Sequence, residues 1–131
     1  MQTANIEAIK IATRILDIRL VEVSASRWKD YFKLPSEKEP CVDFANKITG
    51  HNYTYKQDGL AESFLIWKWW NDFVNDISLS IGGKFNYKPT KKNNMTVTLV
   101  EVLPNYMAKI RAKDKLEYEV RMEDLFFKKE N

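Results

Sequence analysis

An uninterrupted helical pattern over residues 60–79 constrains the fold of this chain more than any other feature. The stretch has no internal Gly or Pro and is followed by Gly82 and Gly83. Placed at about 100° per residue, its large apolar side chains share one arc roughly 160° wide. They are Ile66, Trp67, Trp69, Trp70, Phe73, Val74 and Ile77. A stripe this wide exceeds what one neighbour covers, so we predict a central helix packed from two sides, with Phe64 on its polar side.

Three shorter helices are predicted before the central one, each marked by a capping residue or a proline. The first covers residues 5–16 with Asn5 as N-cap, the second begins at Ser26 and ends before Pro35, and the third covers residues 41–48 between Pro40 and Gly50. Apolar and polar side chains alternate after the first helix, which predicts a short strand over residues 17–23. A single helix that continues through to Val23 is the alternative.

The C-terminal part has the pattern of an antiparallel sheet. A short strand is expected at residues 84–87, and a meander of three strands at residues 95–103, 106–112 and 116–121. Pairing the apolar faces of the last two strands places Arg111 opposite Glu117 and Lys109 opposite Glu119. Opposite charges across strands are favourable, so hydrophobic pattern and charge pattern predict the same register. The strand at 95–103 has apolar residues on both faces.

These patterns predict one α+β domain over residues 1–131, the usual length of a single domain. A Trp-rich helical part, residues 1–83, packs on a β-meander part, residues 84–131. Residues 95–128 contain three strands, a short turn at residues 122–125 and then Phe126-Phe127-Lys128. This order resembles the strand pattern of SH3-like small barrels. The resemblance implies that fold for this part, and since such barrels bind peptides, proteins or nucleic acids, it names no partner.

Cysteine content and apolar runs bear on the compartment. The single cysteine, Cys41, excludes an internal disulfide, which favours a reducing compartment, so we expect a cytoplasmic protein. Charged residues interrupt the apolar stretch at residues 6–18, so no signal peptide is expected. No run reaches the ~20 apolar residues of a membrane span, and no membrane association is expected.

The sequence offers few groups for catalysis. Cys41 and His51 are one arithmetically possible nucleophile–base pair, but their surroundings favour a buried thiol and a surface imidazole. One Cys and one His are too few for a zinc site. Carboxylates paired along the chain favour solvated or ion-paired roles; they are Asp72/Asp76, Glu117/Glu119 and Glu123/Asp124. We therefore predict no catalytic residue, no metal site and no cofactor, and a protein that is not an enzyme.

Aromatic residues outside the central stripe are the first candidates for a binding site. They are Trp28, Tyr31, Phe32, Phe64, Phe126 and Phe127. Exposed aromatic clusters mark protein interfaces, although packing of all six in the core remains the alternative. The leading hypothesis is a non-enzymatic binding protein whose partner is another protein, as an accessory subunit or an inhibitor. The Lys- and Asn-rich composition is compatible with a phage or mobile-element origin.

Basic loops are the second candidate. Residues 84–131 hold 11 Lys or Arg against 7 Asp or Glu, so this part carries the positive excess. The loop lysines are Lys88, Lys91, Lys92, Lys113 and Lys115. With tyrosines nearby, loops 88–92 and 113–115 are typical of a small barrel that follows a phosphate backbone and stacks bases. Nucleic-acid binding is therefore the alternative function. The oligomeric state is not predicted.

Overall fold

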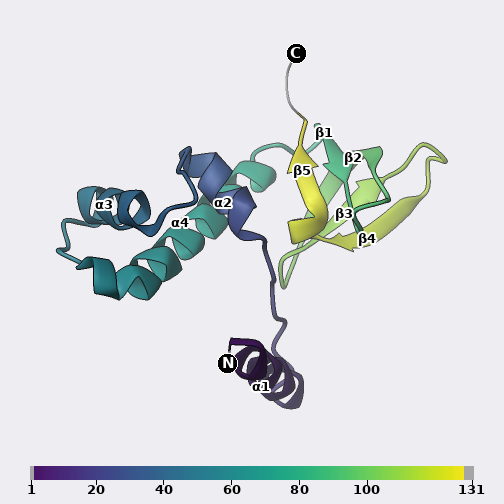
Figure 1. Cartoon of the computed structure of the whole chain (residues 1–131). Coiled ribbons are helices and arrows are strands. Elements are labelled where there is room, and N and C mark those ends of the chain that lie inside the picture. The colour runs from purple at the N-terminus through teal and green to yellow at the C-terminus, as the bar shows by residue number, and fades with distance from the viewer. Residues whose placement is uncertain (1, 129–131) are drawn as a thin grey trace.

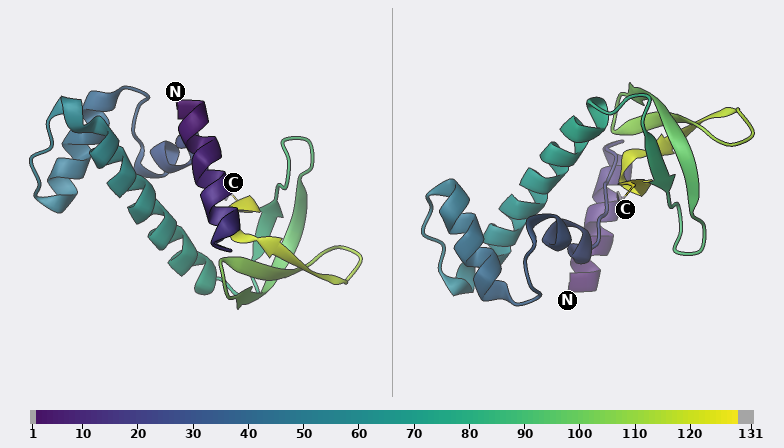
Figure 2. Two further views of the ribbon diagram at one scale, coloured as in Figure 1. Left: turned by 90° about the horizontal axis from the view of Figure 1, so that it is seen from below. Right: turned by 90° about the horizontal axis from the view of Figure 1, so that it is seen from above.

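The computed structural model describes residues 2–128 of the chain, with side chains from residue 7 onward. The described residues form four α-helices, two 3-10 turns and a five-stranded antiparallel sheet, so the predicted α+β class is confirmed. Helices α2, α3 and α4 lie on one side and the sheet on the other, while α1 lies apart from both (Figure 1). In Figure 2 the long helix α4 runs from α3 to the sheet, where its C-terminal end leads into β1.

Helix α4 (Asp58–Ser78) is the predicted central helix. Its buried residues recur at every fourth position: Ala61, Leu65, Trp69, Phe73 and Ile77. Helices α2 (Ala25–Phe32) and α3 (Lys38–Thr49) pack against it. The predicted stripe was too wide, because Ile66 is 37% and Trp67 60% exposed. Phe64, assigned to the polar side, is instead partly buried against the core.

The shorter helices differ from their predicted bounds mainly at their N-terminal ends. Helix α1 (Gln2–Ile15) begins before Asn5, which therefore lies inside the helix and is not its cap. The cap of α2 is Ser24, two residues before the predicted Ser26. At the C-terminal end of α3, Gly50 has a φ of 75°, so its predicted role as a left-handed cap is confirmed.

Residues 16–24, which we call the connector, join α1 to α2 without forming a helix or a strand. Both alternatives predicted for this segment are therefore wrong. Asp17, with a φ of 54°, ends the helical direction of α1. Beyond it the side chains of Arg19, Val21 and Val23 are half-buried, whereas Leu20 and Glu22 are exposed. The connector thus has the alternation of a strand but, within the described chain, no neighbouring strand to pair with.

The sheet has the order β4-β3-β2-β1-β5, with all neighbours antiparallel. Its strands are β1 (Lys84–Tyr87), β2 (Met95–Leu103), β3 (Met107–Arg111), β4 (Glu117–Arg121) and β5 (Leu125–Phe127). The predicted register is confirmed, with Arg111 opposite Glu117 and Lys109 opposite Glu119. Arg111 forms the expected ion pair with Glu117 at 2.9 Å, but the Lys109 ammonium lies nearest Glu101 on β2, at 3.6 Å.

A bulge at Val100 explains why the sequence of β2 has apolar residues on both faces. Leu99 pairs with Ile110 and Val102 pairs with Ala108, so the residues between them shift the register by one position. Before the bulge odd-numbered side chains face the core, and after it the even-numbered Val102 lies on that face. One strand therefore changes its inward phase midway.

The last part of the chain follows the order seen in the sequence: β4, a 3-10 turn (η2, Met122–Asp124), then β5. β5 pairs with β1, and Lys88 N–H donates to the carbonyl of Asp124 at 2.8 Å. β4 and β5 are the two edges of the sheet, which does not close among the described residues. A closed barrel is thus not confirmed.

Candidate functional site

The six aromatic residues proposed from the sequence do not form one cluster. Trp28 is 2% exposed and belongs to the core, so it cannot contact a partner in the folded chain. Phe32, Phe64 and Phe126 are half-buried on three different elements. Only Tyr31 on α2 and Phe127 on β5 are well exposed, at 46% and 42%. The Tyr31 hydroxyl donates to Asp72 at 3.3 Å, and desolvation raises the pKa of this tyrosine.

The basic loops flank a groove on the sheet. This sheet groove has a volume of about 350 Å³ and is lined by Tyr87, Met95, Ile110, Ala112, Asp114, Tyr118, Glu119 and Val120. The loop 88–92 leaves the groove at Tyr87 and the turn 113–115 borders it at Asp114, so the fold brings the two predicted loops to one groove. The charged residues of its lining are the two carboxylates, and all five loop lysines lie outside it.

Hydrogen bonds hold Asp114 at the rim of the sheet groove. Its carboxylate accepts from the Tyr118 hydroxyl at 2.6 Å and from the Leu116 N–H at 2.9 Å. The Tyr118 hydrogen bond is the larger cause that lowers the pKa of Asp114, and the same bond raises the pKa of Tyr118. Lys88, by contrast, points its ammonium over the Phe126 ring, 5.0 Å from the centroid. The lysines thus contribute charge at the border of the groove rather than inside it.

Cys41 and His51 have the placements favoured from the sequence. Cys41 is fully buried in α3, its Sγ lies 3.5 Å from the carbonyl oxygen of Glu37, and burial raises the pKa of its thiol. His51 lies exposed just past the end of α3, with its ring 5.3 Å from that of Tyr53. Across the described residues, no three His, Cys, Asp or Glu side chains are grouped as ligands for a metal ion. No described helix is both long and apolar enough to cross a membrane.

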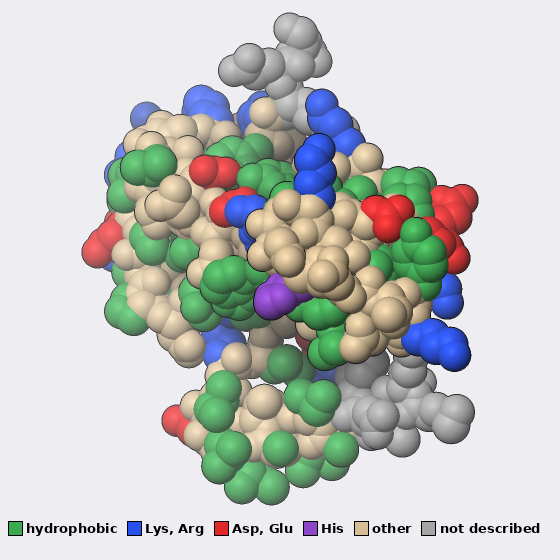
Figure 3. Space-filling view, turned by 90° about the vertical axis from the view of Figure 1, so that its left-hand side faces the viewer, with side chains coloured by type: hydrophobic (Ala, Val, Ile, Leu, Met, Phe, Trp, Pro, Cys, Tyr) green, Lys and Arg blue, Asp and Glu red, His purple; other side chains and the backbone are tan. Residues whose placement is uncertain are grey.

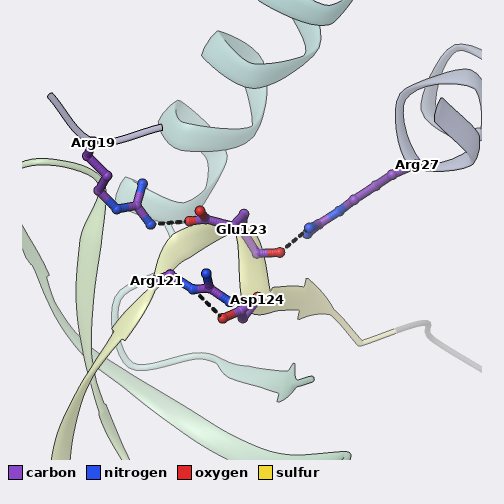
Figure 4. A network of polar contacts seen from close by, with 5 residues as sticks. All are labelled: Arg19, Arg27, Arg121, Glu123 and Asp124. Atoms are coloured by element: carbon purple, nitrogen blue, oxygen red, sulfur yellow. Dashed lines mark hydrogen bonds and ion pairs between the residues drawn. The ribbon is translucent and has the colours of Figure 1, made fainter. Parts of the chain in front are cut away.

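A network of charged groups joins the helices to the sheet at η2 (Figure 4). Arg19 of the connector pairs with Glu123, whose side chain is only 6% exposed, and Arg121 pairs with Asp124 at 2.9 Å. Arg27 of α2 donates to the backbone carbonyls of Glu123 and Leu125. Each acid therefore has an arginine partner, and the cluster ties elements together rather than presenting a free catalytic group.

The Arg27 guanidinium is packed between aromatic rings. It lies 3.8 Å from the centroid of Phe126 and 4.6 Å from that of Phe73. Burial lowers the pKa of Arg27 to about 10, against the opposing effect of Asp124 and Glu123, which leaves the group charged at neutral pH. The Phe126 ring therefore packs on Arg27 at the contact between the helices and the sheet.

An apolar groove between the connector and α4 was not predicted. One part of this α4 groove is lined by Val21, Val23, Ser63, Ile66, Trp67 and Trp70, and the adjoining part, of about 520 Å³, also by Ile9, Leu20 and Glu22. Trp67 offers 60% of its surface, and Phe64, one of the six proposed aromatics, lies beside it with ring centroids 5.9 Å apart. The excess width of the predicted helical stripe was the sequence signal for this surface.

Helix α1 adds a second uncovered apolar surface. Ile11 and Ile15, one helical turn apart, are 54% and 78% exposed. In Figure 3 α1 forms the lower lobe, and hydrophobic side chains gather on its visible face. An ion pair of 3.5 Å from Lys10 to Glu22 links the helix to the connector. An amphipathic helix normally buries its apolar stripe, so this one is available for contact with another molecule.

Comparison of the chain with protein-family models, with curated proteins and with solved structures finds no match.

Proposed function

We propose that the chain is a non-enzymatic binding protein that holds another protein in the α4 groove, as an accessory subunit or an inhibitor. The observation that carries this proposal is the exposure of Trp67 beside Ile66 and the half-buried Trp70, in a groove that α4 and the connector line. Folded monomers rarely leave contiguous apolar patches in water unless those patches bind something.

Trp67 has the properties of an interface hot spot. Tryptophan is enriched among the residues that dominate binding energy, and these residues sit in apolar surroundings near the centre of an interface. At 60% exposure it has on the order of 100 Å² left to bury. At about 25 cal/mol per Å², covering that surface stabilises a complex by roughly 2–3 kcal/mol.

A pull-down from native lysate of the source cell tests the proposal. The wild-type chain is expected to retain a partner in stoichiometric amount, and Trp67→Glu to lose it. Leu60→Glu is the matched control, because Leu60 is a large exposed apolar residue of the same helix that does not line the groove. A monomer without a stoichiometric partner, or a partner kept by Trp67→Glu, would overturn the proposal.

We also propose that the sheet is an SH3-like small barrel. The order β4-β3-β2-β1-β5, the bulged strand β2 shared between β1 and β3, and the 3-10 turn before β5 support it. A barrel of this kind predicts that the outer edges of β4 and β5 lie close across η2. Slow amide exchange at those edges in the full chain would support closure, and fast exchange would contradict it.

Nucleic-acid binding by loops 88–92 and 113–115 is a second candidate function. The observation in its favour is that both loops border the sheet groove, where Tyr87 and Tyr118 offer rings for stacking. The carboxylates of Asp114 and Glu119 in the lining count against it. Binding of a labelled single strand at low salt, with the salt slope falling by close to two units in Lys91→Glu plus Lys92→Glu, is the expected result. No binding at low salt would refute it.

A further inference from the structure

We infer that residues 18–23 of the connector are an open backbone edge without a neighbouring strand, and that an extended segment of the partner protein pairs with this edge and fills the α4 groove. This inference rests on the proposed function and specifies how the partner is held. A segment that adds a strand to an open backbone edge gains affinity from main-chain hydrogen bonds and specificity from side-chain pockets.

The side chains of the connector already have the arrangement of a strand. Exposure alternates along it, with Arg19, Val21 and Val23 turned inward and Leu20 and Glu22 turned outward. A period of two is the period of extended backbone. The composition agrees, because Val21, Val23 and Ile18 are β-branched residues that favour strands. Sequence and structure therefore both show the alternation of extended backbone, although no strand lies beside the segment.

The backbone of this segment is unpaired. Residues 19–23 make no backbone–backbone hydrogen bond to any other residue that the structure describes, whereas those on either side do: Ile18 N–H donates to Thr13 at 2.8 Å, and the Ser24 carbonyl accepts from Arg27 at 3.2 Å. An open row of N–H and C=O groups is a template for pairing with another chain. Five successive unpaired residues match the usual length of a strand.

The connector is held in place before a partner arrives. Arg19 is anchored to Glu123, Val23 packs against the core, and the Ser24 carbonyl accepts from the Arg27 N–H at 3.2 Å. Fixing both ends reduces the ordering that binding requires, so more of the hydrogen-bond free energy is left for affinity. The hydrogen-bonding edge of the connector is therefore preorganised.

The α4 groove determines the chemistry of the occupant. Ile66, Trp67 and Trp70 form an apolar wall beside the connector, so a strand laid along it buries every second side chain against that wall. Glu22 is the one charged residue of the lining, and its carboxylate forms an ion pair with Lys10 at 3.5 Å. The groove thus fits an extended segment with apolar residues at alternate positions and no acidic residue, with one basic side chain at most, opposite Glu22.

Selection from a displayed library of random peptides of about ten residues, long enough for a strand, tests the occupant. The full chain serves as target, and Trp67→Glu removes peptides that bind elsewhere. Enriched sequences are expected to place apolar residues at every second position. Enrichment of the helical spacing of three and four, or no enrichment over Trp67→Glu, would overturn strand pairing.

Proline substitutions test the hydrogen bonds with a selected peptide. Along an extended backbone, successive N–H groups point to opposite edges, so only one of Val21 and Glu22 donates to the partner. Proline removes the donor and fits extended backbone. Relative to alanine at the same position, one of Val21→Pro and Glu22→Pro is expected to weaken binding at least about tenfold and the other less than about threefold.

The same variants separate this inference from the proposed function. Equal losses in both proline variants, or a loss in neither, would overturn strand pairing. If binding still disappears in Trp67→Glu, the groove remains a protein-binding site with a different mode of contact. If Trp67→Glu binds as well as wild type, both proposals fail.

Discussion

Replacement of Arg27 by methionine tests how the helices are joined to the sheet. The guanidinium donates two charge-assisted hydrogen bonds, to the carbonyls of Glu123 and Leu125. Bonds of this kind contribute about 1.5–3 kcal/mol each, or roughly 3–6 kcal/mol together. Its position 3.8 Å from the Phe126 centroid adds about 0.5–2 kcal/mol of cation–π attraction.

Two effects reduce the net loss. Methionine retains an apolar stem that packs on the same rings, and it removes the desolvation that lowers the pKa of Arg27 to about 10. We therefore expect Arg27→Met to lower the free energy of unfolding by about 2–4 kcal/mol, a large share of the ~5–15 kcal/mol typical of a domain. With an m-value of ~2 kcal/mol/M, the urea midpoint falls by about 1–2 M.

Equilibrium urea unfolding followed by tryptophan fluorescence measures this change. Arg111→Met is the matched control, because Arg111 lies on β3 and its ion pair with Glu117 is solvent-exposed. Exposed pairs contribute less than about 1 kcal/mol, so its midpoint is expected to stay near that of wild type. If the two variants lose the same stability to within about 0.5 kcal/mol, Arg27 does not hold the junction together and the reasoning is refuted.

Three further outcomes are expected from local geometry. Gly83→Ala should lower the free energy of unfolding by about 1–3 kcal/mol, because a Cβ there would meet a backbone carbonyl oxygen at 2.9 Å. Gly59→Ala, which has open space around it in α4, should raise the free energy of unfolding by up to about 1 kcal/mol. Thermal unfolding compares the two variants. Tyr118→Phe should raise the pKa of Asp114, followed by NMR titration of the carboxyl group. Because the folded pKa of Asp114 is depressed, the stability it contributes is present above its ordinary value of 3.8 and is lost as pH falls through the folded pKa; this loss should shrink in Tyr118→Phe. The thiol of Cys41, buried and with a raised pKa, should react with a thiol reagent at pH 8 far more slowly in the folded chain than in urea, and equal rates would show that α3 opens readily.

Features that depend on residues close together in the sequence were predicted from local patterns. Helix α4 and the β3–β4 register follow from periodicity and from charges a few residues apart, and both are confirmed. Periodicity identifies the residues that share a face of the helix, but it does not show whether another element of the chain packs on that face. This is why Trp67 was placed in the core although it is exposed.

Features that depend on distant parts of the chain were not predictable in this way. A strand exists only when another strand pairs with it, so the alternation over residues 17–23 could not reveal that the described chain lacks the neighbour. The groove lined by Val21 and Trp67 joins segments that are far apart in sequence. Nor does any sequence pattern distinguish Arg27, which holds the junction, from the solvent-exposed Arg111 on β3.

The bulge at Val100 has a consequence for how this sequence can change over generations. At the bulge, the side chains that face the core change from odd-numbered to even-numbered positions. The apolar residues after the bulge therefore face the core only if the strand keeps its one extra residue. Substitution of Val100 alters one side chain, but loss of its codon would turn Val102 and every later residue of the strand to the opposite face. The gene should therefore tolerate many replacements at this position and reject a deletion.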